Sequence, residues 1–159
     1  SIGGKEAAEK RLDEMFRRLD ASYGDEWFAS GNEPSFQIPW IYNWAGAPYK
    51  AQQVIRRILN EQYSSRVNGL PGNDDLGSMG AWYVFASIGL FPEIPGVGGF
   101  SVNSPVFRKI VLHLPEGDVI IKGGDEKKEY IHSLSLDGKK MEGTWIDWSD
   151  LYRGGDLGI

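Results

Sequence analysis

The hydrophobic pattern of this 159-residue chain changes its period near Pro92. Before Pro92, apolar side chains recur at the three- and four-residue intervals of a helix face. After it, they gather in short runs rich in valine and isoleucine, separated by glycine, proline or aspartate. Helices followed by strands are typical of the α+β class. We therefore expect a helical segment over residues 1–92 and an antiparallel β segment over residues 93–159.

The helical segment should contain four helices. Their expected ranges are residues 5–21, 38–45, 48–63 and 79–88. Pro48 suits the first turn of the third helix, and Ser78 can act as the N-cap of the fourth. The fourth helix is apolar on almost every side, so we expect neighbouring elements to bury it.

The β segment should contain several short strands. Their expected ranges are residues 100–102, 106–114, 118–122, 130–136 and 144–148. Asp137-Gly138 is the dipeptide that a two-residue hairpin turn favours. Another strand begins at residues 154–157, where the sequence stops, and so few helices make an incomplete bundle. Both features indicate a fragment truncated within its β segment.

Composition excludes several classes of function. The chain has no cysteine, which rules out disulfides, thiolate catalysis and cysteine-ligated metal centres. Its net charge of −5 gives no sign of a nucleic-acid or anionic membrane partner. No stretch approaches the roughly 20 apolar residues that a membrane-spanning helix needs. We expect neither nucleic acid nor a membrane among its partners.

Residues 31–35, Gly-Asn-Glu-Pro-Ser, are the first segment that can carry chemistry. Asn32 and Glu33 offer hard oxygen ligands on a loop that Pro34 stiffens, which suits calcium. The alternative is an ordinary turn in which Asn32 or Ser35 caps the next helix. The segment alone leaves both interpretations open.

Residues 72–77, Gly-Asn-Asp-Asp-Leu-Gly, are the second such segment. Adjacent acids at a helix entrance often do no more than meet the positive end of the helix dipole. A glycosidase or a metal site also needs a carboxylate held rigidly and partly desolvated. The spacing does not fit an EF-hand, which alternates its ligands over about twelve residues.

Eight aromatic residues fall within residues 23–49. Trp40, Tyr42 and Trp44 follow helical spacing there. Such a group is either part of a core or a set of platforms for stacking on sugar rings. Composition does not decide between the two.

Three segments taken together resemble glycoside hydrolase family 92. Residues 31–34 and 39–52 are similar to the family's GNEP motif and the following P-Y-L-Y-x-Y-x-G-x-P-W-K-T-Q. Residues 69–85 resemble its G-N-[DE]-D-x-G-x-M-S-A-W-Y-V-F segment, and residues 103–107 resemble a later G-S-P-x-F element. The motifs occur in the family's order, and the similarity runs from about residue 5 to the end.

The resemblance implies an enzyme that removes terminal α-linked mannose from glycans by inverting, calcium-dependent hydrolysis. It implies that residues 1–92 are the end of an (α/α)6 barrel, with a β-sandwich upstream and β structure downstream. Family members are typically secreted or periplasmic. Mannose-containing glycans would be the partners and Ca2+ the cofactor.

The matching motif positions carry the family's roles onto particular residues. Asn32, through its carbonyl, and Glu33 correspond to the calcium site. Asp75 corresponds to the general base, and Asn73 falls where some members carry a second, base-assisting aspartate. The expected substrate-binding residues are Asp74, Gln37 and Trp40.

The chain departs from the family at two points. Many members place histidines directly after GNEP, where this chain has Phe36 and Gln37. The family's general acid lies upstream, and no residue here matches it, so we expect the chain alone to be inactive. Two other hypotheses stay open: a carbohydrate-binding module without turnover, and an interaction piece that self-associates through an exposed apolar helical face.

Overall fold

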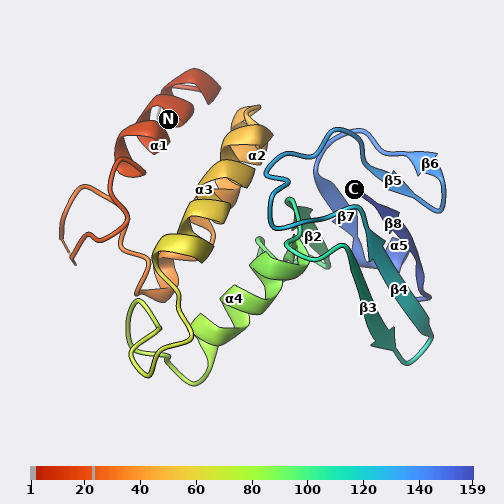
Figure 1. Ribbon diagram of the computed structural model, residues 1–159. Coiled ribbons are helices and arrows are strands. Elements are labelled where there is room, and N and C mark those ends of the chain that lie inside the picture. The colour runs from red at the N-terminus through yellow and green to blue at the C-terminus, as the bar shows by residue number, and fades with distance from the viewer. Residues whose placement is uncertain (1–2, 23) are drawn as a thin grey trace. The chain divides into compact units, whose positions relative to one another are not determined.

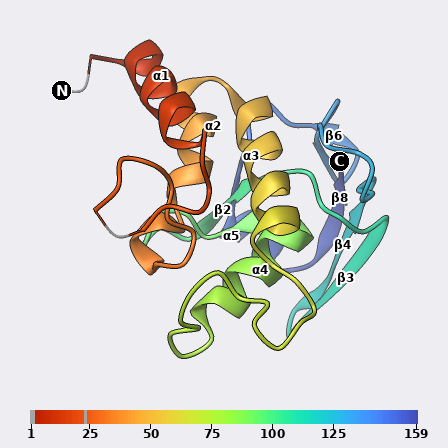
Figure 2. The same cartoon turned by 60° about the vertical axis from the view of Figure 1, so that its left-hand side comes forward.

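Most of the helices lie in the first of two structural units. The computed structural model describes residues 3–22 and 24–159, and its chain divides into Ser1–Val84 and Phe85–Ile159 (Figures 1 and 2). Tyr23, one of the eight clustered aromatic residues, lies outside the described residues. The first unit contains α1 (Lys5–Met15), η1 (Glu33–Ser35), η2 (Ile38–Trp40), α2 (Ile41–Ala45) and α3 (Pro48–Glu61). Helix α4 (Ser78–Ile88) begins in this unit and ends in the second.

Helix α3 is the longest element of the first unit. Pro48 stands in its first turn, where a missing amide proton removes no helical hydrogen bond. Gly46, in the left-handed conformation with φ of 90°, ends α2 and lets the chain turn into α3. The buried face of α3 includes Val54, Ile55 and Ile58. The helix expected over residues 48–63 is thus confirmed as α3, which ends at Glu61, and the one expected over residues 38–45 forms as η2 followed by α2.

Helix α1 is shorter than the sequence pattern predicts. The pattern extends to residue 21, whereas α1 ends at Met15. The amide of Phe28 donates to the carbonyl of Met15 at 3.0 Å, so a returning loop satisfies the end of the helix. Phe16 and Leu19 remain buried, but they pack from a turn rather than from a helix. The prediction of residues 17–21 as helix was therefore wrong.

The second unit consists mainly of two small sheets. One has the order β1-β2-β7, and the other has the order β3-β4-β8-β5-β6. The strands are β1 (Leu90–Phe91), β2 (Gly99–Val102), β3 (Lys109–Leu114), β4 (Gly117–Lys122), β5 (Ser135–Leu136), β6 (Lys139–Lys140), β7 (Trp145–Asp147) and β8 (Gly155–Gly158). A short helix, α5 (Trp148–Leu151), follows β7.

The larger sheet is mixed rather than antiparallel. Strand β8 pairs parallel to β4, with Val119 opposite Gly155 and Ile121 opposite Leu157. All other pairings in the two sheets are antiparallel. The expectation of a purely antiparallel β segment is corrected here. A parallel pair joins strands that are distant in sequence, so it has no hairpin turn from which the sequence could predict it.

Of the strands and the hairpin expected in the second unit, some form as predicted and others are shorter. The hairpin at Asp137-Gly138 is confirmed, with φ angles of 49° and 75° between β5 and β6. Of the strand expected at residues 130–136, only Ser135–Leu136 forms, and the one expected from residue 106 begins at Lys109. The further strand expected near residue 154 is present as β8.

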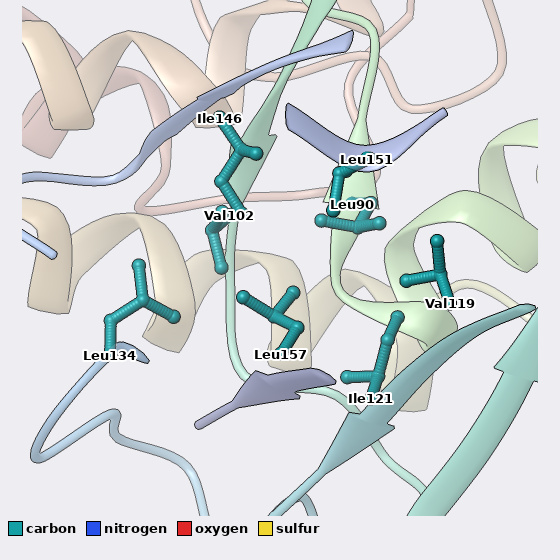
Figure 3. Close-up of a cluster of buried hydrophobic side chains, with 8 residues drawn as sticks. All are labelled: Leu90, Val102, Val119, Ile121, Leu134, Ile146, Leu151 and Leu157. Carbon is teal, nitrogen blue, oxygen red and sulfur yellow. The ribbon is translucent and has the colours of Figure 1, made fainter. Parts of the chain in front are cut away.

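A cluster of buried apolar side chains fills the second unit (Figure 3). Its members come from both sheets, from α5 and from the loop before β5: Leu90, Val102, Val119, Ile121, Leu134, Ile146, Leu151 and Leu157. Alternation along β4 points Val119 and Ile121 into this cluster, while Asp118 and Lys122 face solvent.

Helix α4 is not covered on every side. Tyr83 and Val84 are 43% and 56% exposed, against the expectation that neighbours bury the whole helix. Of the helices in the described part of the chain, none has the length and apolar character that crossing a lipid bilayer requires.

Candidate active site

The first functional segment is a tight turn that projects a carboxylate. Asn32 has extended backbone angles and accepts, through its carbonyl, a 3.0 Å hydrogen bond from the amide of Ser35. Glu33 opens η1 and is exposed, and Pro34 fixes the next backbone angle. The side chain of Asn32 makes no capping hydrogen bond, so the alternative in which it caps a helix is not supported.

The second functional segment is the loop that leads into α4. The carboxylate of Asp74 accepts a 3.2 Å hydrogen bond from the amide of Gly80, and its carbonyl accepts one of 3.2 Å from Met79. Ser78 instead donates its hydroxyl proton to the carbonyls of Asp74 and Asp75. The prediction that Ser78 caps α4 was therefore wrong. Asp74 accepts hydrogen bonds from two amides at the start of α4, those of Met79 and Gly80. Its negative charge also complements the positive end of the helix dipole.

The backbone around Asp75 is strained. Asp75, Leu76 and Gly77 have φ angles of 50°, 60° and 93°, three consecutive residues in the left-handed region. For residues with a side chain this conformation is unfavourable by roughly 1–2 kcal/mol each. Such strain persists only where surrounding structure enforces it, and it is commonest at functional sites. The result is that Asp75 is half-buried while Leu76 points fully into solvent.

Two glycines bring the segments into direct contact. A Cβ on Gly31 would lie 2.6 Å from the carbonyl oxygen of Pro71, and one on Gly72 would collide with the backbone of Gly31. Atoms at such distances overlap, so only glycine permits this approach of one backbone to the other. The sequence therefore requires Gly31 and Gly72 for the two loops to meet.

The carboxyl groups of Glu33 and Asp75 come together at this contact. Partial desolvation raises the pKa of Asp75, and the charge of Glu33, a hydrogen bond shared with it, and the charge of Asp74 raise it further. The amide of Asn73 donates a 2.9 Å hydrogen bond to Asp75 Oδ1 and acts in the opposite direction. Adjacent carboxylates disfavour each other's charged form, and a cation between them would relieve this effect.

The other expected site residues have different surroundings. Gln37 is half-buried at the start of η2 and makes no capping hydrogen bond. Trp40 has 0% exposure, so its ring belongs to the core and has no face on which a sugar could stack. Helical spacing alone could not show which side of the turn Trp40 occupies.

Sequence reasoning missed Trp82 as part of this region. Its indole N–H donates a 3.1 Å hydrogen bond to the carbonyl of Phe36, directly after η1. The ring of Tyr63 stacks on Trp82 at 5.8 Å with an interplanar angle of 7°. The residue stands in an apolar helix, so nothing in the pattern distinguished it from core.

The oxygen atoms near Glu33 and Asp75 are the candidate donors for a metal ion. The described residues contain no group of three or more histidine, cysteine, aspartate or glutamate side chains placed to hold an ion. The pair Glu33 and Asp75, with the carbonyl of Asn32 and the amide oxygen of Asn73, supplies hard oxygen donors of the kind that calcium prefers. This donor set fits calcium in its chemistry, and further ligands must come from water, substrate or other residues.

Comparison with known proteins identifies the family. The model of the glycosyl hydrolase family 92 catalytic domain matches residues 1–159. An uncharacterized secreted glycosidase of Arthroderma benhamiae is 33% identical over 146 residues, which are 88% of this chain and 19% of that protein.

Two solved structures from Bacteroides thetaiotaomicron have the same fold. The family GH92 α-mannosidase BT3965 matches with a TM-score of 0.86 and 32% identity, over 98% of this chain and 21% of that one. The family GH92 inverting mannosidase BT2199 matches with a TM-score of 0.85 and 30% identity, over 99% and 24%. The chain thus spans between 19% and 24% of the length of these three relatives. Since the family model covers it from end to end, the chain belongs to glycosyl hydrolase family 92.

Proposed function

We propose that this chain supplies the base and calcium-binding part of the active site of an exo-α-mannosidase. The observation that carries the proposal is the meeting of Glu33 and Asp75, which come from separate loops that glycine contacts press together. The names of the relatives support the substrate. BT3965 is described as an α-mannosidase and was also solved with mannoimidazole, and BT2199 is described as an inverting mannosidase.

Asp75 is the proposed general base. An inverting glycosidase needs a carboxylate that accepts a proton from water on one face of the sugar. The raised pKa of Asp75 makes it a stronger base than an ordinary aspartate. The hydrogen bond from Asn73 to Oδ1 orients the carboxylate that would accept the proton of the attacking water.

Glu33 and the carbonyl of Asn32 are the proposed calcium ligands. When bound, calcium would supply positive charge that orients the hydroxyls of the terminal mannose and polarises them. The positive charge of the ion would offset the repulsion between the carboxylates of Glu33 and Asp75. Asp74 caps α4 and holds the loop on which Asp75 stands.

The remainder of the site is proposed to lie outside these residues. In an inverting enzyme the acid and the base are about 6.5–9.5 Å apart, with the sugar and the water between them. No residue of this chain matches the family's acid, so it would come from upstream. The first unit would then be the end of an (α/α)6 barrel, and the second a β module that follows it. The description of the fungal relative as secreted supports an extracytoplasmic location.

The 159-residue chain alone should not hydrolyse mannosides. It should also tend to self-associate, because Trp44, Tyr49 and Val84 expose 49%, 52% and 56% of their surface. Hydrolysis of an aryl α-mannoside by this chain alone would contradict the assignment of the acid to another region.

The experiment that tests the proposal uses the full-length protein with an aryl α-mannoside, with and without a calcium chelator. We expect calcium-dependent hydrolysis with inversion at the anomeric carbon, read by NMR. Asp75→Asn should lower kcat by about 10²–10⁴-fold, the usual contribution of a general base. Asp150→Asn is the matched control, since Asp150 is an exposed aspartate in the first turn of α5. Mannoside binding without hydrolysis would instead favour a carbohydrate-binding module.

A further inference from the structure

One hydrogen bond connects the two loops of the candidate site independently of their glycine contact. Trp82 Nε1 donates to the carbonyl oxygen of Phe36 at 3.1 Å. Phe36 is the C-terminal cap of η1, the turn that Glu33 opens. Trp82 stands in α4, the helix that follows directly on the loop of Asp75. A single side chain therefore links the element that carries Glu33 to the element that positions Asp75.

The indole of Trp82 is held in place from its own side. It is 3% exposed, and the ring of Tyr63 lies parallel to it at 5.8 Å. The hydroxyl of Tyr63 donates to the carbonyl of Met79 at 3.4 Å, which anchors Tyr63 to α4 as well. A buried, stacked indole has little rotational freedom, so its N–H direction is fixed.

The glycine contact and this hydrogen bond act in opposite directions. Close contact between Gly31 and Gly72 prevents the loops from coming closer, and its dispersion attraction resists their separation only weakly. The charge of Glu33 disfavours the charged form of Asp75, so the two acidic loops tend to move apart. A hydrogen bond resists such separation, and the one from Trp82 to the carbonyl of Phe36 has the geometry to do so.

We infer that Trp82 is a positioning residue that sets the separation between Glu33 and Asp75 and thereby tunes calcium affinity. The part of the inference that concerns calcium affinity rests on the proposed function. Trp82 touches neither ion nor sugar in this role. It acts through the carbonyl of Phe36 and the short turn that ends there.

The test compares Trp82→Phe with wild type in the full-length protein. Phenylalanine keeps an aromatic ring against Tyr63 and removes the N–H donor, together with part of the ring volume. We expect calcium affinity, measured by calorimetry, to fall about 10–100-fold, as it does when outer-shell partners of metal ligands are removed. Saturating calcium should then restore kcat toward the wild-type value. A general loss of folded protein would lower activity without this recovery.

A matched control removes another indole hydrogen bond. Trp145 Nε1 donates to Asp147 at 2.9 Å in the second unit, and Trp145→Phe should leave calcium affinity unchanged. Wild-type affinity in Trp82→Phe, or lost activity that calcium does not recover, would overturn the inference.

A second measurement separates this inference from the proposed function. Without calcium, amide hydrogen exchange should be faster in Trp82→Phe than in wild type across residues 31–37 and 72–77. If wild type neither binds calcium nor hydrolyses mannosides, the proposed function fails, and the exchange comparison still decides whether Trp82 holds the loops. Unchanged exchange in both loops would show that it does not.

Discussion

The carbonyl oxygen of Pro71 lies 2.6 Å from the point where a Cβ of Gly31 would stand. This contact is the reason that the loop of Glu33 reaches the loop of Asp75. It also couples the backbone positions of the two loops, because neither loop can change its backbone without moving the other. The consequence can be tested at Gly31 itself.

Gly31→Ala should weaken the site without removing any of its ligands. The added methyl group would push the Pro71 carbonyl away and separate Glu33 from Asp75. We expect calcium affinity and kcat/KM to fall by about tenfold or more, within the range found for shifted metal ligands. Calorimetry and steady-state kinetics on the full-length protein measure both.

Gly80→Ala is the matched control for this change. A Cβ at Gly80 would meet only Asp74 Oδ1, at an ordinary contact distance of 3.8 Å. Alanine in the first turns of α4 should raise helix stability by about 1 kcal/mol and leave calcium affinity unaltered. Equal losses in both variants would contradict the role assigned to the glycine contact.

Asp75→Asn should make the calcium-free protein more stable at neutral pH. The folded-state pKa of Asp75 is raised, first by desolvation and then by Glu33, so its charged form is disfavoured on folding. The stability linked to this group is complete below the ordinary aspartate pKa of about 3.9 and is lost as pH rises through the higher folded pKa. Asparagine does not titrate and avoids that loss.

Thermal unfolding in a chelator at pH 7 and pH 4 measures this difference. The stabilisation by Asp75→Asn should be larger at pH 7 than at pH 4, and added calcium should reverse its sign. Asparagine also tolerates left-handed backbone, which adds an offset that is independent of pH. A stabilisation equal at both pH values would mean that only this backbone effect operates.

Lys50→Met should loosen α1 from the rest of the helical unit. The ammonium of Lys50 lies 2.7 Å from Glu9 Oε1 and 2.7 Å from Asp13 Oδ2, and the buried Tyr42 donates its hydroxyl proton to Asp13. Hydrogen bonds to Asp13 and Glu9 raise the pKa of Lys50, so it stays charged. Loss of the cation leaves two acids facing each other and should cost about 1–3 kcal/mol, the usual value for hydrogen bonds to charged groups.

Amide exchange of α1 measures the effect of Lys50→Met. Lys140→Met is the control, because its pair with Glu142 spans 3.7 Å between side chains that are 79% and 91% exposed. Exposed pairs of this kind contribute roughly 0–1 kcal/mol. If α1 exchanges at the wild-type rate in Lys50→Met, Lys50 does not hold it.

Local chemistry predicted much of this fold. Pro48 marked the start of α3, and Asp137-Gly138 marked the hairpin between β5 and β6. The acidic segments at residues 31–35 and 72–77 were identified as candidates from their oxygen ligands, but residue types alone left a turn or a helix cap open for each. Each of these signals acts within a few residues of the feature that it predicts.

What the sequence did not predict depends on contacts between distant residues. Helix α1 ends at Met15 because Phe28 returns to bond with it, and β8 pairs parallel to β4 across more than thirty residues. Burial of Trp40 depends on which side of η2 meets the core. The hydrogen bond from Trp82 to Phe36 joins residues 46 positions apart, so no local pattern could indicate it.

Leu157→Ala should open the second unit, because β8 contributes its one fully buried side chain to the common core. Leu157 is 0% exposed, and its backbone pairs opposite Ile121 (Figure 3). Removing a buried leucine side chain costs about 2–5 kcal/mol, since the cavity closes only in part. Proteolytic cleavage under native conditions follows the population of the opened form, so its rate in this unit should rise by at least about tenfold. Val97→Ala is the control: Val97 is 49% exposed, and its cleavage rate should stay at the wild-type value. Equal rates for both variants would mean that the unit holds together without β8.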